Sequence, residues 1–415
     1  MARLSPILKQ ATPVTVSHAE GLVVVGEDGR RYLDFTAGIG VTSTGHCHPE
    51  VVAAIGEQAG KLIHGQYVTV KHRPLLTLCE RLGQVLPEQL DSLFFANSGS
   101  EAMEAALRLA RQATGRPNVI VFHGGFHGRT VGAASMTTSS ARFRTGYAPL
   151  MGGVHIAPFP NAYRYGWDAD TATRFALREL DFLLATVTAP EDTAAFVVEP
   201  VLGEGGFVPA NTAFFQGLRE RADRHGFLLV LDEVQTGIGR TGRFWGHQHF
   251  GVRPDVLVAA KGLTSGLPLS FLAASEALMS KALPGSQGGT YGGNAVACAA
   301  AIATLDVIAK EKLVDNAANQ GRKLLDGLRH IAADNEIIGD VRGLGLMLGC
   351  EFAGPDGQPD PDVALRVQRE AIEQGLLLQI GGPWRNVLRL LPALVVGDED
   401  VDEALRIVSN AVKTA

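Results

Sequence analysis

The stretch FLLVLDEVQTGIGRTGRFWGHQHFGVRPDVLVAAK, residues 227–261, indicates how the rest of the chain folds. It begins with the apolar run 227–231 and ends with a second apolar run, 256–260. Both runs are short, rich in valine and leucine, and bounded by Gly, Pro or Asp, which is typical of strands buried on both faces of a parallel sheet. Asp232 follows the first run and Lys261 the second. Because chemistry in open parallel sheets collects beyond the carboxyl ends of strands, both are candidate functional residues.

An amine and a carboxylate at neighbouring strand ends are the pair that pyridoxal phosphate requires. The lysine carries the aldehyde as a Schiff base, and the acid keeps the pyridinium nitrogen protonated. A covered cleft would desolvate Lys261 and leave its amine nucleophilic. The plainer interpretation makes Asp232 a turn residue and Lys261 a solvated loop residue, so other motifs have to decide.

Length and composition predict a large globular protein. The chain has 415 residues, 46% hydrophobic and 19% charged, which favours two or three domains with substantial cores. The net charge is −6 and there is no basic cluster, so the composition gives no indication of a nucleic-acid surface and we expect no nucleic-acid partner. No run reaches the roughly 18 apolar residues of a membrane helix, and residues 1–16 contain no secretory leader. We therefore expect a cytoplasmic protein with no membrane partner.

The cysteines do not form a disulfide framework. Cys47, Cys79, Cys298 and Cys350 are scattered, as is typical of core residues in a reduced, intracellular protein. Two histidines flank Cys47, but no third or fourth ligand stands at a known spacing, so no metal site is predicted.

Strand and helix patterns alternate in the middle of the chain and predict an α/β fold, with a parallel sheet between helices. The predicted strands are residues 92–96, 119–122, 195–198 and 227–231. The predicted helices are residues 101–113 and 212–225, with another beginning at Pro49.

Smaller elements are predicted at both ends of the chain. Residues 21–35 predict a hairpin with its turn at Asp28-Gly29. The last third predicts helices 291–310, 322–333, 362–374 and 400–413, and strands 341–352 and 387–391. We expect an N-terminal segment 1–49, a large domain 50–307 and a C-terminal part 308–415, with the first and last forming a smaller α+β domain.

Ser98 and Glu101 match a capping box at the start of a helix. Gly99 leaves backbone N–H groups accessible there, which is a natural phosphate site. Taken alone, the motif indicates only an ordinary helix start. A lysine and an aspartate of the required kind downstream favour phosphate binding.

Phe126 and Arg129 follow the strand that ends at residue 122. The aromatic ring is suited to stacking on a flat ligand, and the arginine to holding a carboxylate. The plainer interpretation is a core phenylalanine beside a surface arginine. His123 and His127 are four residues apart, but the glycines between them exclude a shared helical face and hence a metal pair.

A third group of charged residues lies further along the chain. Glu199 and Glu204 stand in a glycine-rich loop after the strand 195–198. Such carboxylates are usually solvated, unless an arginine faces them. Arg389 lies inside an apolar run, where its charge needs a partner, so it is the candidate arginine to face one of these carboxylates.

The glycines at 237, 239 and 242 match the dinucleotide pattern G-x-G-x-x-G. They begin several residues after the strand, and no helix pattern follows them. Because the pattern has meaning only between a strand and a helix, we predict an ordinary loop.

Together these residues resemble the class III pyridoxal-phosphate aminotransferases of fold type I, over nearly the whole chain. The motifs that carry the resemblance are DFTAGIGVTSTGHCHP (34–49), NSGSEA (97–102), FHGRT (126–130), EPVLGEGG (199–206), LDEVQTGIGRTG (231–242), AAKGL (259–263), GGTYGGN (288–294) and NVLRLL (386–391). The resemblance implies a large domain with a mostly parallel seven-stranded sheet between helices. It also implies a ping-pong transfer of an amino group.

The resemblance also implies roles in binding pyridoxal phosphate. Lys261 would carry the cofactor and move the proton, and Asp232 would pair with the pyridinium nitrogen. The other implied cofactor contacts are Ser98, Gly99 and Ser100 at the phosphate, Phe126 and Val234 on the ring faces, Gln235 at the phenolic oxygen, and His127. Thr290 would reach the phosphate of the partner subunit, which implies a homodimer; a tetramer stays open.

Within the family, the motifs at 288–294 and 381–391 are most similar to 4-aminobutyrate aminotransferases. In that branch Arg129 would bind the far carboxylate of the substrate, and Ile39 would line the substrate pocket. Arg389 would bind the α-carboxylate of glutamate or 2-oxoglutarate and pair with Glu204 otherwise. Ala295 departs from the branch, which usually has proline there. The alternatives are acetylornithine or ornithine as donor, and an amino-acid racemase of the same family.

Overall fold

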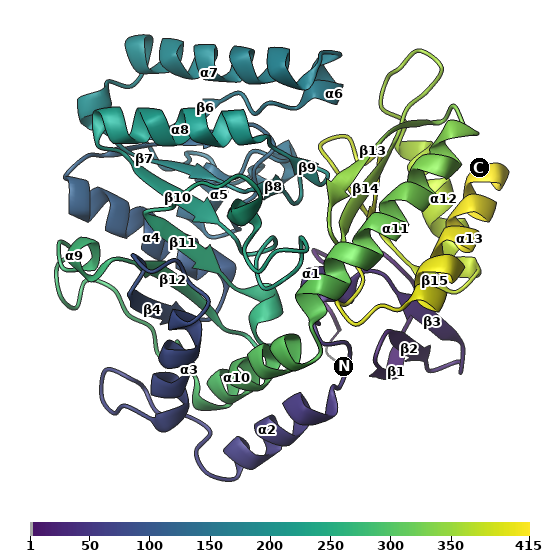
Figure 1. Cartoon of the computed structure of the whole chain (residues 1–415), viewed down its shortest axis with the longest axis horizontal. Helices are drawn as coiled ribbons and strands as arrows, with labels where there is room; N and C mark the ends of the chain where they lie inside the picture. Colours follow the sequence, from purple (N-terminus) through teal and green to yellow (C-terminus); the bar gives the residue numbers. More distant parts are fainter. Residues whose placement is uncertain (1–2) are drawn as a thin grey trace.

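The computed structural model describes residues 3–415 and has a seven-stranded sheet at its centre (Figure 1). Its strands are β4 (Ser92–Ala96), β5 (Asn118–Phe122), β6 (Val154–Ala157), β7 (Thr193–Val198), β10 (Leu228–Asp232), β11 (Val256–Ala259) and β12 (Ser270–Ala274). Their order is β4-β12-β11-β10-β7-β5-β6, and only β12 runs antiparallel to its neighbours. The predicted α/β fold with a mostly parallel seven-stranded sheet is confirmed.

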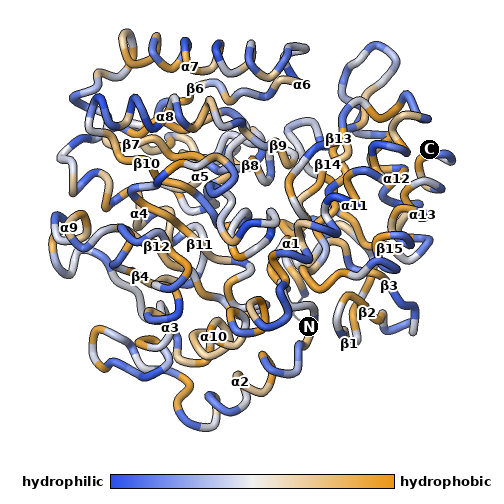
Figure 2. The backbone as a smooth tube through the Cα atoms, in the orientation of Figure 1, coloured by the Kyte–Doolittle hydropathy of each residue, from blue (hydrophilic) through white to orange (hydrophobic). Residues whose placement is uncertain are grey.

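Helices cover both faces of this sheet. Its connecting helices are α4 (Gly99–Thr114), α5 (Val131–Met136), α6 (Ala162–Tyr165), α7 (Ala169–Thr186), α8 (Thr212–His225) and α9 (Glu276–Met279). Successive strand side chains point to opposite faces, so Val230 packs in the α4 cluster, whereas Leu229 packs with Phe214 of α8. The strands therefore appear as apolar segments between the helices in Figure 2.

A second set of elements lies beside the large sheet. One sheet, in the order β13-β14-β17-β16, consists of β13 (Ile338–Leu344), β14 (Met347–Phe352), β16 (Gln379–Gly381) and β17 (Val387–Leu390). The helices α11 (Leu313–Ala333), α12 (Pro361–Glu373) and α13 (Asp398–Thr414) accompany it (Figure 1). The other sheet consists of β1 (Val16–Glu20), β2 (Val23–Gly26), β3 (Arg31–Asp34) and β15 (Leu376–Leu377). Because β15 pairs with β3, the two ends of the chain share a sheet.

The remaining elements connect these parts. They are α1 (Ala37–Gly40), α2 (Pro49–Ala59), α3 (Arg73–Gly83), α10 (Ala295–Lys310), β8 (Val201–Leu202) and β9 (Val208–Pro209). The domain division at 49/50 and 307/308 stays a prediction, and the second boundary lies inside α10.

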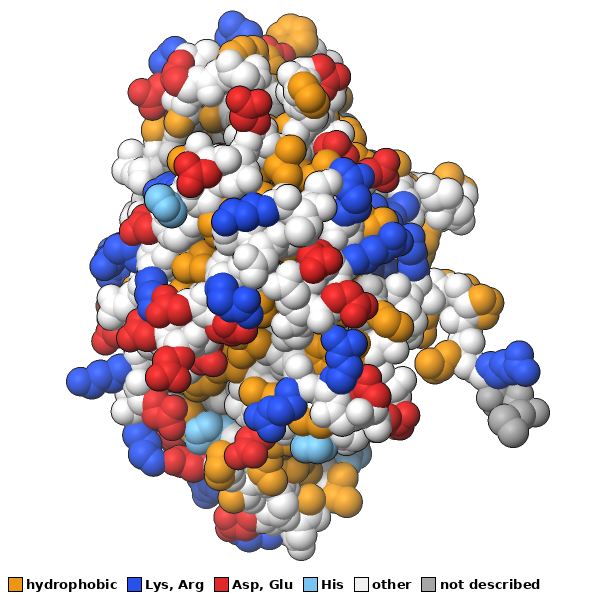
Figure 3. Space-filling view, turned by 90° about the vertical axis from the view of Figure 1, so that its right-hand side faces the viewer, with side chains coloured by type: hydrophobic (Ala, Val, Ile, Leu, Met, Phe, Trp, Pro, Cys, Tyr) orange, Lys and Arg blue, Asp and Glu red, His pale blue; other side chains and the backbone are white. Residues whose placement is uncertain are grey.

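Near the N-terminus, Leu4, Ile7 and Leu8 are exposed on a segment that projects from the body in Figure 3. No helix within residues 3–415 has the length and apolarity to cross a bilayer.

Several predicted element boundaries were wrong. The predicted strand 341–352 is a hairpin, because Gly345 (φ 54°) reverses the chain between β13 and β14. The predicted helix 291–310 begins only at Ala295, where Asn294 accepts hydrogen bonds from the first turn. Ala295 thus occupies a first helical position, where proline is also favoured, so the departure from the family pattern is local. The glycines at 237, 239 and 242 lie in a loop, as predicted.

Candidate active site

A cavity of about 360 Å³ lies beyond the carboxyl ends of β7, β10 and β11. This volume suits a small cofactor with its substrate. The wall consists of Val41, Asn97, Ser98, Gly99, Ser100, Phe126, His127, Gly128, Glu199, Glu204, Asp232, Val234, Gln235, Ala260, Lys261, Gly266, Leu267, Pro268 and Leu269. Ten of the predicted site residues are therefore brought together around one cavity.

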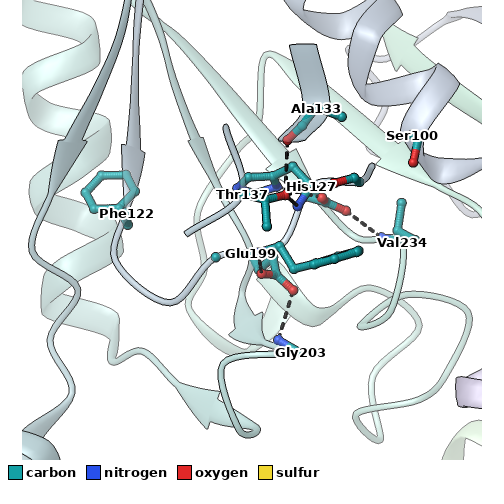
Figure 4. Close-up of polar contacts among 12 residues, drawn as sticks. Ser100, Phe122, His127, Ala133, Thr137, Glu199, Gly203 and Val234 are labelled. Carbon is teal, nitrogen blue, oxygen red and sulfur yellow. Dashed lines mark hydrogen bonds and ion pairs between the residues drawn. The ribbon is translucent and has the colours of Figure 1, made fainter. Parts of the chain in front are cut away.

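Asp232 is the last residue of β10, and two hydrogen bonds fix its carboxylate. His127 Nδ1 lies 2.8 Å from Oδ2, and the Val234 N–H donates to Oδ1 at 3.1 Å. Burial opposes a charge on His127, but the hydrogen bond and the charge of Asp232 outweigh burial and raise the pKa of the imidazole. The backbone N–H of His127 donates to Thr137 Oγ1 at 3.0 Å, which holds the residue in place (Figure 4). The acid therefore has a defined orientation towards the cavity.

Lys261 lies two residues beyond β11 and begins a 3-10 turn, Lys261–Leu263. Its φ of 37° lies in the left-handed region, which is uncommon for a residue with a side chain and is found more often at functional sites. Burial lowers the pKa of Lys261 below its ordinary value, although the charges of Glu204 and Asp232 oppose this. A larger neutral fraction makes the amine a better nucleophile.

The N-terminus of α4 opens onto the same cavity. Ser98 caps the helix, and Ser98 with Glu101 forms the predicted capping box. A Cβ on Gly99 would lie 3.0 Å from Val234, so a larger residue would crowd the wall. The helix has 16 residues, and its free N–H groups and dipole favour an anion such as a phosphate.

Glu204 and Arg389 form an ion pair at the edge of the cavity. Arg389 Nη1 lies 2.6 Å from Glu204 Oε1, and the side chains are 6% and 18% exposed. Arg389 Nη2 also donates to Gln379 Oε1 at 3.2 Å, and the guanidinium carbon lies 5.4 Å from the ring centroid of Phe207. Burial would raise the pKa of Glu204, but Arg389 outweighs it and lowers that pKa. The carboxylate is therefore ionised and its arginine paired.

Comparisons with known proteins identify the family. The profile of the family "Aminotransferase class-III" matches residues 7–412. The chain is a class III aminotransferase. It is 39% identical to the 5-aminovalerate aminotransferase DavT of Pseudomonas putida over 403 residues, which cover 97% of this chain and 94% of the relative. It is also 39% identical to the 4-aminobutyrate aminotransferase GabT of Escherichia coli over 409 residues, covering 98% and 95%.

A solved structure agrees with this assignment. The PLP-bound amine transaminase from an uncultivated Pseudomonas species superposes with a TM-score of 0.93 at 30% identity, and the match covers 100% of this chain and 99% of that one. The predicted cofactor, pyridoxal phosphate, is thereby confirmed for this aminotransferase.

The cavity residues fit this cofactor. Gln235 is buried, yet neither polar atom of its amide has a hydrogen-bond partner within residues 3–415. Such a group needs a partner, and a phenolic oxygen is suitable. Phe126 and Val234 present apolar surfaces to the cavity, and the start of α4 offers N–H groups to a phosphate. The structure leaves the individual roles of these residues as predictions.

Glu199 was missing from the predicted site residues of the aminotransferase. It is buried in the cavity wall, where Oε1 accepts the Phe126 N–H at 2.8 Å and Oε2 accepts the Gly203 N–H at 2.9 Å (Figure 4). Burial and the charge of Asp232 raise the pKa of Glu199 from 4.5 to about 7. The available signal was its position directly after a buried strand, the same signal that identified Asp232.

Four predicted site residues are not part of the cavity wall. Arg129, Thr290 and Ile39 are exposed, and Arg389 lies behind Glu204. The guanidinium carbon of Arg129 lies 4.8 Å from the ring centroid of Phe143. No cluster of metal-ligating side chains was found in the part of the chain that the structure describes.

Proposed function

We propose that the enzyme is an ω-aminotransferase that moves the terminal amino group of 4-aminobutyrate or a similar ω-amino acid to 2-oxoglutarate by a ping-pong mechanism. The observation that carries this proposal is the Glu204–Arg389 pair at the cavity. An ω-amine has no carboxylate beside its amine, whereas glutamate and 2-oxoglutarate have one. Arg389 can serve both kinds of substrate if Glu204 pairs with it in one half-reaction and releases it in the other, which avoids an unpaired buried charge.

In this proposal, each half-reaction uses the same cavity residues. The bound cofactor supplies an electron sink for the substrate carbon that loses its proton. Asp232, oriented by His127, keeps a positive charge at the pyridinium nitrogen. Lys261 Nζ would take the proton from the amine-bearing carbon and hold it for the return transfer. Arg129 would hold the carboxylate at the far end of the substrate, and Ile39 would line the substrate pocket.

We further propose that the active unit is a homodimer. Thr290 is exposed and lies outside the wall of its own cavity, which suits a residue that reaches the phosphate of a partner subunit. Whether two dimers pair into a tetramer follows from the mass in solution. A monomeric holoenzyme with full activity would contradict this role of Thr290.

The test is a panel of amino donors with 2-oxoglutarate or pyruvate as acceptor. We expect ω-amino acids to react with 2-oxoglutarate, and both the alternative donors acetylornithine and ornithine to react more slowly. Incubation with a single amino-acid enantiomer and no oxo acid distinguishes the racemase alternative. Scrambling of that enantiomer without formation of an oxo acid would refute the proposal.

A further inference from the structure

Two arginines that lie near the cavity but outside its wall, Arg142 and Arg385, have no role in the reaction proposed above. Arg142 lies in the 3-10 turn Ala141–Phe143, and Arg385 lies in the turn between β16 and β17. None of the salt bridges within residues 3–415 involves either of them, or Arg129. Within residues 3–415, therefore, these three arginines carry positive charge that no salt bridge neutralises.

Phe143 joins Arg142 to the cavity. The guanidinium carbons of Arg129 and Arg142 each lie 4.8 Å from the ring centroid of Phe143. The two guanidinium carbons are therefore no further apart than twice that distance. The same ring contacts Phe126 of the cavity wall, with 5.2 Å between centroids and 73° between planes. Arg142 is thus a neighbour of Arg129 on the side of the cavity where a substrate's far carboxylate would lie.

The turn that contains Arg385 is attached to the cavity wall from a different part of the chain. The Gly382 N–H donates to the Glu204 carbonyl at 3.1 Å, and the Arg385 N–H donates to the Gly382 carbonyl at 3.1 Å. This turn is therefore fixed against the residue that pairs with Arg389. The φ of Arg385 is 60°, a left-handed conformation that a side-chain-bearing residue rarely adopts.

The arginines affect one another. Burial lowers the pKa of Arg142, the charges of Arg385, Arg129 and Arg389 lower it further, and Glu204 opposes them. Glu204 already neutralises Arg389, so the cluster carries a net positive charge. Like charges held together without a counterion are unfavourable, and an anionic ligand relieves that cost.

We propose that Arg142 and Arg385 form a second carboxylate site beside Arg129, and that this site selects substrates whose far end carries two carboxylates. The proposal rests on the proposed role of Arg129 at the first far carboxylate. Planar guanidinium groups bind carboxylates bidentately, so two neighbouring arginines suit two carboxylates on the same or adjacent carbons. A donor with a single carboxylate would leave the second site to water.

The test measures binding of two unreactive anions to the holoenzyme. The probes are adipate and butane-1,2,4-tricarboxylate, which has the same chain with one additional carboxylate. Affinity is read from the change in cofactor absorbance and, independently, from competitive inhibition against 4-aminobutyrate. We expect the tricarboxylate to bind about tenfold more tightly than adipate, because a partly exposed charge-assisted pair lies at the low end of its range.

Substitutions assign that preference to the second site. Arg142→Gln and Arg385→Gln should each reduce it several-fold, the double variant should abolish it, and adipate affinity should change much less. Arg178→Gln is the matched control, since Arg178 also lies over a phenylalanine, Phe175 at 5.8 Å, but on α7. An unchanged preference in the double variant, or equal affinities in the wild type, would overturn the second site.

The two proposals fail in different ways. If Arg129→Gln leaves adipate affinity unchanged, the far-carboxylate role of Arg129 in the proposed function is wrong. If adipate binding depends on Arg129 but the extra carboxylate adds no affinity, only the second site is wrong.

Discussion

Replacing Glu204 with alanine should shift the enzyme away from ω-amines and towards α-amino acids. Glu204 pairs with Arg389 at 2.6 Å, and both side chains are largely buried. In the ω-amine half-reaction the substrate brings no carboxylate to Arg389, so the variant must complete it with an unpaired arginine. In the glutamate half-reaction the substrate's α-carboxylate pairs with Arg389, and the variant no longer has to break the protein's own pair.

The size of the shift follows from the contacts of Arg389. Removing one partner of a fully buried ion pair costs about 3–5 kcal/mol. Here Gln379 keeps a contact with Arg389 at 3.2 Å, and Glu204 faces the cavity. We therefore expect about 1.5–3 kcal/mol, the range for a hydrogen bond to a charged group. At about 1.36 kcal/mol per tenfold, the ratio of ω-amine to glutamate rate constants should fall by about 10- to 150-fold.

The assay is a pair of single-turnover half-reactions followed by cofactor absorbance. One uses 4-aminobutyrate with the pyridoxal form, and the other uses glutamate with the same form. Glu204→Gln is the control, since it keeps an oxygen acceptor for Arg389 without the charge and should give an intermediate ratio. Equal losses in both half-reactions of Glu204→Ala would refute the proposed gate.

Four further results are expected. Lys261→Ala should lose both turnover and the absorbance of covalently bound cofactor; turnover that persists would contradict its role. Arg129→Ala should raise KM for carboxylate-bearing donors about tenfold or more while sparing simple amines, and an unchanged ratio of the two would count against it. Glu199 has a raised pKa, so it contributes stability below about pH 4.5 that is lost as pH rises to about 7. In Glu199→Gln, the free energy of unfolding measured by urea titration should therefore change less between pH 4.5 and 7 than it does in the wild type. If the two enzymes show the same pH dependence of the unfolding free energy, this prediction is wrong. Burial raises the pKa of Cys298 to about 12, so a thiol reagent should modify it only after unfolding, as mass spectrometry of native and denatured samples would show.

The parts of the site that could be predicted are those that depend on local sequence. The runs before Asp232 and Lys261 form buried strands because their continuous apolar side chains are stable only when both faces of the strand are covered. The residues that follow such strands lie at the carboxyl edge of the sheet. The capping box of Ser98 and Glu101 is likewise satisfied within four residues. These signals place the cofactor cavity without any knowledge of distant contacts.

The missed features depend on contacts between distant parts of the chain. The position of Glu199 directly after a buried strand is a local signal, but its hydrogen bond to Phe126, 73 residues away, cannot be read from the sequence around it. The position of the turn that contains Arg385 likewise depends on how the residues before β17 pack against Glu204. The alternation of side chains along a strand does not show which way the strand runs, so the antiparallel direction of β12 could not be predicted from the sequence.

The loop from Glu199 to Gly206 suggests how the gate can open without disturbing the cofactor. The Gly203 N–H is bonded to the Glu199 carboxylate, the Glu204 carbonyl accepts from Gly382, and the Gly206 carbonyl accepts from Arg342. The backbone on both sides of Glu204 is therefore fixed, whereas within residues 3–415 its carboxylate forms a hydrogen bond only to Arg389 and otherwise faces the cavity. Releasing Arg389 then requires rotation of one side chain and no movement of the loop. Because Glu199 also holds the backbone of Phe126, a gate that moved the loop would shift the ring that is predicted to stack on the cofactor in every catalytic cycle, and side-chain rotation avoids that coupling.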